Sequence, residues 1–333
     1  MAMKVLVTGG SSLIGAGVAN ALASRGDDVV CLQRSPSALV DAVVAQHLGD
    51  IREREVVVEA ATGCDAIVHV AAKVGVVGSW EDYRSINVDG TVNVIAAALD
   101  RGVPRVVYVS SPSVAHGGEP IVAGAADVPV LGRRRAWYPE SKAMAEITAL
   151  DAASGNLGVV AVRPHLVWGP GDTQLVGRIV ERARTGRLAL VGGGRALVDT
   201  TYIDNAVAAL VAALDAVQPR AACSGRAYVV SNGEPRMIRE LVEGICSAAG
   251  VPFVPRDVSL RVGRSAGAVV ERVWPMLRRN DEPPLTQFLA EQLGTAHWFD
   301  PRPARDDLGY CPAVSIDEGL HRLAMWFDEH AAR

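Results

Sequence analysis

The sequence predicts an α/β protein with a doubly wound parallel sheet and a smaller second lobe. Short, apolar, Val-rich segments alternate with helical patterns through the first half, and such alternation builds a parallel sheet covered by helices on both faces. The first apolar segment ends in the glycine-containing turn Thr8–Gly15, which opens an Ala-rich helical pattern that runs to about Arg25. The pattern changes after Gly169, which indicates a second structural unit.

The elements follow in order from periodicity and turn residues. Strands are predicted over residues 4–7, 28–33, 66–72 and 103–109, with a short third strand that ends at 49–51. A helix is predicted over 87–99, and another begins near Pro139, since the first turn of a helix tolerates proline. In the second half we predict helices over 174–185, 202–214 and 238–249, and a strand over 188–191.

Composition excludes several classes of protein. The chain has 333 residues, of which 49% are hydrophobic, and a net charge of -4, so it holds one large or two modest domains and no nucleic-acid partner is expected. Five scattered cysteines without a Cys-x-x-Cys pair predict reduced thiols and a cytoplasmic location. We see no signal peptide, no membrane-spanning segment and no metal-ligand spacing, so no metal is predicted.

The turn after the first strand predicts a dinucleotide site. A strand, a glycine turn and a helix in succession are the context in which this fingerprint is credible, because the helix N-terminus points free N–H groups at a diphosphate. One position departs from the usual pattern: Ser12 stands where a second glycine lets the backbone approach phosphate closely. Its hydroxyl could bond phosphate, or the loop could lie slightly farther away.

The end of the second strand bears on coenzyme choice. A site that prefers NAD carries an acid there to hold the ribose 2′-hydroxyl. This chain has Gln33 followed by Arg34, and a guanidinium in place of an acid favours a 2′-phosphate. We therefore predict NADP, with NAD as the alternative if Arg34 is only an exposed loop residue.

Tyr138 and Lys142 are the candidate acid–base pair. Their four-residue spacing puts a phenol and an amine on one face of a helix, where the ammonium is expected to lower the phenol pKa. A phenol tuned in this way can exchange a proton with a carbonyl or alcohol. The spacing alone is common on solvated helices. Ser110, Ser111 and Ser113 follow the fifth strand, at the sheet edge nearest the proposed coenzyme.

Together these motifs resemble the extended short-chain dehydrogenase/reductase superfamily, and within it the 3β-hydroxysteroid dehydrogenase branch. The matching residues are Thr8-Gly9-x-x-Ser12-x-x-Gly15, Asp50-Ile51, His69-x-Ala71-Ala72, Asn87-x-x-Gly90-Thr91, Ser110-Ser111, Tyr138-x-x-x-Lys142, Arg163-Pro164 and Gly169-Pro170-Gly171-Asp172. Their order and spacing agree over nearly the whole chain. Stretches outside the coenzyme motifs are similar to the ketoreductases of bacterial long-chain olefin biosynthesis; they include residues 111–114, 198–205, 227–235 and 282–293.

The resemblance implies a Rossmann-type domain and a role for each matching residue. Tyr138 protonates the substrate oxygen as hydride arrives, Lys142 holds the nicotinamide ribose, and Ser111 binds the carbonyl oxygen, with Ser113 as a substitute. Asn87 supports the coenzyme side of the site. The implied coenzyme-binding residues are Thr8, Gly9, Ser12, Leu13, Ile14, Gly15, Arg34, Asp50, Ile51, Ala71, Ala72, Lys142, Pro164 and Leu166. For the side chains of His69 and His165 we favour packed, neutral imidazoles.

The resemblance also implies a discontinuous domain boundary. Residues 1–165, with return segments at about 196–232, are assigned to the NADP-binding domain, and residues 166–195 and 233–333 to a substrate-binding lobe. Within the lobe, residues 261–279 form an amphipathic stretch that could line a site for acyl tails, although an ordinary packed helix is favoured. Residues 133–135, three consecutive arginines, could pair with a substrate carboxylate, although a solvated loop is favoured.

The implied function is NADP-dependent reduction of the 3-keto group of a long-chain 2-alkyl-3-oxoalkanoic acid, a lipid-like keto acid. A 3β-hydroxysteroid or sterol dehydrogenase is the first alternative. A nucleotide-sugar epimerase ranks lower, because its relatives carry an Arg-Asp-aromatic triplet where this chain has residues 198–202. A non-catalytic NADP-binding protein would be expected to lose Tyr138 or Lys142. A homodimer and partner enzymes of an olefin pathway follow from the resemblance alone.

Overall fold

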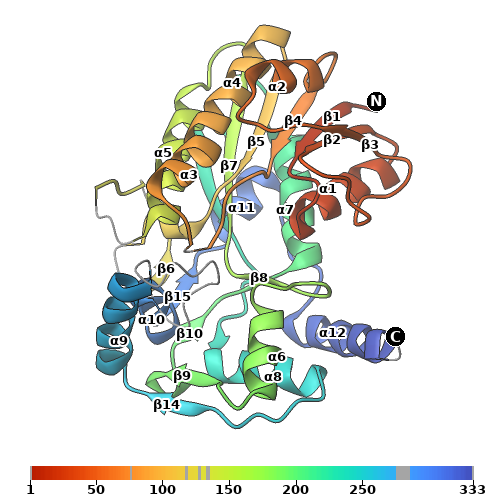
Figure 1. Cartoon of the computed structure of the whole chain (residues 1–333). Coiled ribbons are helices and arrows are strands. Elements are labelled where there is room, and N and C mark those ends of the chain that lie inside the picture. The colour runs from red at the N-terminus through yellow and green to blue at the C-terminus, as the bar shows by residue number, and fades with distance from the viewer. Residues whose placement is uncertain are drawn as a thin grey trace.

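A computed structural model describes residues 2–75, 77–116, 119–126, 129–132, 136–274 and 286–331, and gives only the backbone for residues 271–273, 288, 289 and 331. Figure 1 shows a large sheet with its helices in the upper half and a smaller lobe below. The arginines at 133–135 lie outside the described residues, as does the part of the amphipathic stretch beyond residue 274.

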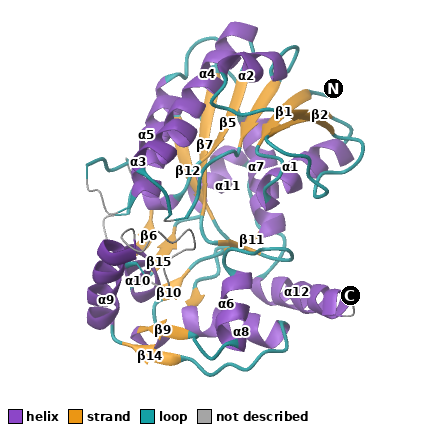
Figure 2. Cartoon of the chain, in the orientation of Figure 1, coloured by secondary structure: helices purple, strands orange, loops and turns teal. Residues whose placement is uncertain are grey.

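A seven-stranded, fully parallel sheet organises the upper half (Figure 2). In spatial order its strands are β12 (Arg226–Val230), β7 (Gly158–Pro164), β5 (Arg105–Val109), β4 (Ala66–His69), β1 (Lys4–Thr8), β2 (Asp28–Gln33) and β3 (Ala45–Leu48). The chain runs outward from β1 to β3 and then returns to add β4 on the other side of β1. The predicted doubly wound, Rossmann-type fold is confirmed, and ligands bind such sheets at the carboxyl ends beside this reversal.

Helices cover both faces of the sheet, each over its own apolar core. One face carries α1 (Leu13–Ser24), α7 (Ile203–Ala216) and α11 (Arg302–Leu308), and the other carries α2 (Arg54–Ala60), α4 (Gly90–Arg101) and α5 (Trp137–Asp151). Successive strand residues point to opposite faces, so Val5 and Val7 enter the first core while Leu6 enters the second. All five cysteines are free thiols, as predicted.

The lower lobe combines segments that are far apart in the sequence. Its four-stranded sheet has the order β13 (Arg236–Met237), β10 (Leu197–Val198), β15 (His297–Phe299) and β6 (Ile121–Gly124). Short sheets pair β11 (Thr201–Tyr202) with β8 (Val167–Trp168), and β14 (Arg256–Val258) with β9 (Ala189–Val191). The helices of the lobe are α6 (Val176–Arg184), α8 (Ile238–Ala248), α9 (Leu260–Val273), α10 (Gln287–Gly294) and α12 (Ile316–Ala331). None of the helices in the described ranges is long and apolar enough to cross a membrane.

Three segments lie elsewhere than the predicted domain division would put them. The strand β6 falls within residues 1–165 but pairs with β15 of the lobe, and β10 joins the same sheet. In the opposite direction, α11 leaves the lobe and packs against α7 and β12. The division into two functional domains stays a prediction, although the return of α7 and β12 to the large sheet agrees with its outline.

The helix predicted over 87–99 has a different start. A short helix, α3 (Trp80–Tyr83), runs into a π-helical segment, η1 (Arg84–Asp89), before α4 begins at Gly90. Segments of π-helix are rare and frequent at functional sites. Here the wider turn carries Asn87, whose surroundings are described below.

Candidate active site

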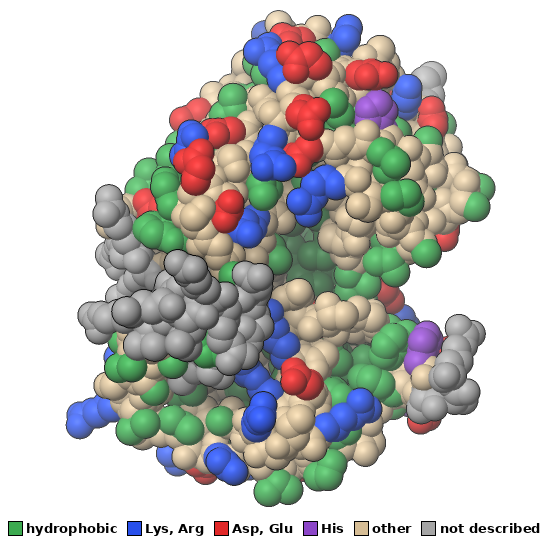
Figure 3. Space-filling view, in the orientation of Figure 1, with side chains coloured by type: hydrophobic (Ala, Val, Ile, Leu, Met, Phe, Trp, Pro, Cys, Tyr) green, Lys and Arg blue, Asp and Glu red, His purple; other side chains and the backbone are tan. Residues whose placement is uncertain are grey.

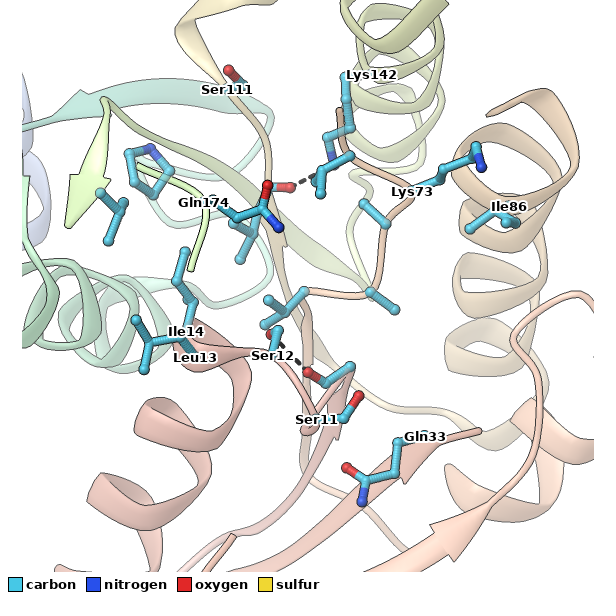
Figure 4. Close-up of a pocket in the computed structure, with 18 of the residues that line it drawn as sticks. Ser11, Ser12, Leu13, Ile14, Gln33, Lys73, Ile86, Ser111, Lys142 and Gln174 are labelled. Atoms are coloured by element: carbon cyan, nitrogen blue, oxygen red, sulfur yellow. Dashed lines mark hydrogen bonds between the residues drawn. The ribbon is translucent and has the colours of Figure 1, made fainter. Parts of the chain in front are cut away.

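A cavity of about 650 Å³ lies beyond the carboxyl ends of the central strands, between the sheet and the lobe. Figure 3 shows the hollow between the two halves of the molecule. In Figure 4, Ser11, Ser12 and Gln33 lie toward one end of the cavity, and Ser111 and Lys142 toward the other. The predicted residues that line the cavity are Gly9, Ser12, Leu13, Ile14, Arg34, Asp50, Ile51, Ala71, Ala72, Ser111, Tyr138, Lys142, Pro164 and Leu166.

The glycine turn is compact because two positions leave no room for a side chain. Gly9 has φ +78°, and a Cβ there would lie 2.8 Å from the backbone of Ala71. A Cβ on Gly15 would collide with the carbonyl oxygen of Gly9. Gly15 therefore lets the helix start pack under the turn, and it is not among the described residues of the cavity wall.

Ser12 is used within the turn. Its Oγ donates to the carbonyl of Gly9 at 2.8 Å and accepts from the N–H of Gly15 at 3.0 Å, which makes it the N-cap of α1. The hydroxyl is thus engaged by the protein's own backbone, and the serine stabilises the helix start. A contact between Ser12 and a phosphate stays a prediction, since Ser12 also lines the cavity.

Replacing Ser12 tests that assignment. The variant Ser12→Ala is expected to lower the free energy of unfolding by about 1 kcal/mol because the cap is lost, and Ser12→Gly by only a few tenths. Urea unfolding of both variants measures the difference. A loss of coenzyme affinity without a loss of stability would contradict the capping role.

Thr8 and His69 form a support beneath the turn. Thr8 Oγ1 lies 2.7 Å from His69 Nδ1, and His69 Nε2 lies 3.0 Å from Thr91 Oγ1. Thr91 donates to the carbonyl of Asn87, so Nε2 must carry the proton that His69 shares with Thr91. Burial lowers the pKa of His69 to about 3, which confirms the packed, neutral imidazole. Thr8 is fully buried and belongs to this support, not to the described cavity wall.

The side-chain amide of Asn87 links three segments that surround the site. Its Oδ1 accepts from the N–H of Lys73 at 2.7 Å, and its Nδ2 donates to the Lys73 carbonyl at 3.0 Å and to Ser141 Oγ at 2.9 Å. These bonds tie η1 to the loop after β4 and to α5. Both amide hydrogens of Asn87 are used in these bonds, and the residue is not in the described cavity wall, so the structure assigns it a supporting position and its catalytic role stays a prediction.

At the other end of the cavity, polar groups gather where the second strand ends. Arg34 and Asp50 both line the wall. The Arg52 guanidinium, with a smaller contribution from Arg34, holds the pKa of Asp50 below its ordinary value against the opposing effect of burial. Gln33 is buried, and its Nε2 donates to Gln46 Oε1 at 2.6 Å. Arg34 is therefore close enough to act on Asp50 electrostatically, and both flank the space beyond β2.

Tyr138 and Ser111 meet at the opposite end. Burial raises the pKa of Tyr138 above its ordinary value, and a hydrogen bond between its hydroxyl and Ser111 acts in the opposite direction. The lowering that the Tyr138–Lys142 spacing predicted is wrong here, because burial has the larger effect and the Lys142 amine donates its hydrogen bond to the Val109 carbonyl. Ser113 lies 2.9 Å from Ser111 and steadies it. A phenol that stays protonated at neutral pH is suited to donate a proton.

Lys142 is buried on the face of α5 that turns toward the sheet. Its Nζ donates to the carbonyl of Val109 at 2.7 Å and lies 4.1 Å from the centroid of the Tyr108 ring. Burial lowers the pKa of Lys142 to about 7, and the Glu146 carboxylate, one turn along the helix, opposes the shift. The amine therefore sits close to its midpoint at neutral pH, which is where a group that moves protons is most useful.

Glu146 and Arg163 form a buried ion pair behind Lys142. Arg163 Nε donates to one carboxylate oxygen at 2.8 Å and its Nη2 donates to the other at 2.5 Å, and both side chains are almost wholly buried. From the sequence, Arg163 was named only as part of a motif and Glu146 was not predicted. The four-residue spacing of Tyr138, Lys142 and Glu146 puts all three on one face of the helix, and this spacing could have revealed Glu146.

The lobe supplies a wall that the sequence did not predict. Gln174 and Arg178 on or near α6 line the cavity, as do Lys73 and Ile86 from the loop and helix after β4.

Leu166 has φ +43°, a strained value for a leucine, where the chain leaves β7. His165 is buried, with a pKa lowered to about 4 by burial, and it does not belong to the described cavity wall. Groups of His, Cys, Asp or Glu able to hold a metal ion are absent from the described part of the chain.

Comparison with known proteins identifies the family of this chain. The sequence model of the 3-beta hydroxysteroid dehydrogenase/isomerase family matches residues 6–258. The chain belongs to this family. It is therefore an NAD(P)-dependent oxidoreductase of the extended short-chain dehydrogenase/reductase superfamily.

Individual relatives agree with the family assignment. The chain is 48% identical over 324 residues to the 2-alkyl-3-oxoalkanoate reductase of Stenotrophomonas maltophilia, covering 96% of this chain and 98% of the relative. It is 32% identical over 338 residues to the 3-beta-hydroxysteroid dehydrogenase of Mycolicibacterium neoaurum, covering 98% and 92%. Among solved structures, MoeE5 in complex with UDP-glucose and NAD has a TM-score of 0.74 at 25% identity, covering 98% and 99%.

The cavity of this family member fits a nicotinamide dinucleotide. Its wall contains two buried polar atoms, Gln33 Oε1 and Ser110 Oγ, that make no hydrogen bond within the described residues. Buried polar atoms are normally paired, so unpaired ones in a cavity wall indicate a polar ligand. Gly9, Ser11 and Ser12 of the glycine turn belong to the same wall, and the N-terminus of α1 that follows them is the kind of site at which backbone N–H groups bind a diphosphate.

Proposed function

We propose that this protein reduces the 3-keto group of a long-chain 2-alkyl-3-oxoalkanoic acid to the 3-hydroxy acid with NADPH. The observation that carries the proposal is the 48% identity, over nearly the full length of both chains, to a 2-alkyl-3-oxoalkanoate reductase. Such an activity also gives the protein a place in hydrocarbon biosynthesis, where an enzyme that condenses acyl chains would supply its substrate.

The proposed roles follow from the positions of three side chains. Tyr138 donates the proton to the substrate oxygen, which its raised pKa allows at neutral pH. Ser111, hydrogen-bonded to Tyr138, orients that oxygen. Lys142 supplies positive charge behind the phenol and stabilises the phenolate left after transfer. The bound coenzyme supplies the hydride.

A direct assay tests the substrate. Because β-keto acids lose carbon dioxide, the stable probe is a long-chain 2-alkyl-3-hydroxy acid with NADP⁺, followed by the appearance of NADPH. We expect turnover with this acid that exceeds turnover with 3β-hydroxysteroids. Brisk oxidation of steroids alongside no reaction with the hydroxy acid would favour the second candidate, a 3β-hydroxysteroid dehydrogenase, which the relative at 32% identity supports.

The coenzyme preference has its own test in Arg34. Arg34→Ala is expected to raise the KM for NADPH at least tenfold, because a charge-assisted hydrogen bond to phosphate contributes about 1.5–3 kcal/mol, and to leave the KM for NADH nearly unchanged. Steady-state kinetics with both coenzymes measures the effect. The matched control is Arg52→Ala, which removes a neighbouring guanidinium that pairs with Asp50 from outside the described cavity wall. Equal losses with both coenzymes would contradict the proposed contact.

A further inference from the structure

Tyr108 packs against the Lys142 amine and has no role in the mechanism above. It belongs to β5, its side chain is fully buried, and Lys142 Nζ lies 4.1 Å from the centroid of its ring. The next residue in the same strand, Val109, accepts the 2.7 Å hydrogen bond from Nζ through its carbonyl. One strand therefore presents two adjacent groups, a π face and a carbonyl oxygen, to one amine.

The other titratable groups around the Lys142 amine do little to stabilise its positive charge. Glu146 is the carboxylate that acts on the amine, but it lies a turn along α5 and is engaged by two nitrogens of the Arg163 guanidinium. His69 on β4 is neutral, and its ring lies 5.6 Å from the Tyr108 ring. Tyr138, the remaining titratable group facing this region, keeps its proton at neutral pH. A buried ammonium over an aromatic face is stabilised more strongly than an exposed one.

Tyr108 contacts Lys142 through its aromatic ring and not through its hydroxyl. Its hydroxyl is buried and has no partner of hydrogen-bond geometry among the described residues, and Thr91, the side chain that acts on its pKa, already donates to the Asn87 carbonyl. A phenylalanine would therefore keep the contact with Lys142 and lose no well-formed hydrogen bond.

We propose that Tyr108 is a positioning residue whose ring face keeps Lys142 charged and holds it in the cavity wall that also carries Tyr138. The proposal rests on the proposed function, because it gives Lys142 a reason to be an ammonium. It adds a residue of the sheet core to the acid–base machinery on α5.

The test measures the ionisation of Lys142 directly in the full-length protein. The rate at which the amine is acylated at each pH, read by mass spectrometry of the peptide that contains Lys142, gives the midpoint, because only the neutral amine reacts. We expect a midpoint near 7 for the unchanged protein. In Tyr108→Leu it should fall by about one pH unit, since loss of the π face favours the neutral form.

Two variants separate the ring from its size and from general loosening. Tyr108→Phe should keep the original midpoint, and so should Tyr228→Leu, which removes an equally buried tyrosine from β12 of the same sheet. If Tyr108→Leu does not fold, a trifluorophenylalanine at position 108 keeps the shape but weakens the negative face, and it should lower the midpoint too. An unchanged midpoint in both ring-altered variants, or an equal fall in Tyr108→Phe, would overturn the proposal.

Turnover gives a second readout and separates the two proposals. The alkaline limb of the kcat/KM profile should move down with the Lys142 midpoint, so Tyr108→Leu loses about tenfold in kcat/KM above the original midpoint and little below it. A uniform loss at every pH would mean structural damage only. If Tyr138→Phe retains full activity, the proposed function fails, while the acylation midpoints still decide the role of Tyr108.

Discussion

Replacing Tyr138 with phenylalanine is expected to lower kcat by about 10²–10⁴-fold, the usual contribution of a general acid. The ring would still fill its place at the start of α5, but the hydroxyl next to Ser111 would be gone. The affinity for NADPH should stay within a factor of about two or three, because packing around the ring is kept. Kinetics with the hydroxy acid and a fluorescence titration of NADPH measure the two quantities.

A matched tyrosine shows whether the effect is chemical. Tyr202 is buried, lies in the lobe and packs against Trp168 with ring centroids 5.4 Å apart. Tyr202→Phe should leave kcat nearly unchanged. Were Tyr138→Phe to retain kcat, the phenol would not be the proton donor, whatever the coenzyme affinity.

Replacing Arg163 with methionine is expected to lower the free energy of unfolding by about 3–5 kcal/mol. The substitution leaves Glu146, which has no exposed surface, as an unpaired charge in the interior. Urea unfolding at neutral pH measures the loss.

The double variant Glu146→Met, Arg163→Met is the control for this interpretation. Replacing both partners of a buried ion pair by apolar side chains is often neutral, so the double variant should recover most of the lost stability. If it is as unstable as Arg163→Met alone, the loss comes from the volume and shape of the arginine side chain and not from the unpaired carboxylate.

Much of the fold could be predicted because its signals are local. The strand Lys4–Thr8, the turn with Gly9 and Gly15, and the helix that starts at Ser12 are each encoded within a few residues. Alternation of such units leaves few parallel arrangements, so the sheet and the edge at which ligands bind follow from the order of elements. The prediction that Tyr138 and Lys142 lie on one face likewise required only that their segment be helical.

The errors arose where distant segments meet. The pKa of Tyr138 was predicted to fall because the neighbour at four residues was an amine, yet β5 takes that amine through Val109 and Tyr108. The strand β6 reaches the lobe because β15, almost 180 residues later, offers it an edge.

The sequence by itself determined the doubly wound sheet, the family and the residue types of the site, because periodicity, glycine turns and helix spacing act over short stretches of chain. Only the tertiary structure decided the protonation of Tyr138 and Lys142, the support given by Asn87 and His69, and the wall contributed by Gln174 and Arg178. Those properties depend on burial and on charges brought within a few ångströms from remote parts of the chain, and Coulomb interactions and desolvation respond to that distance and not to separation along the sequence.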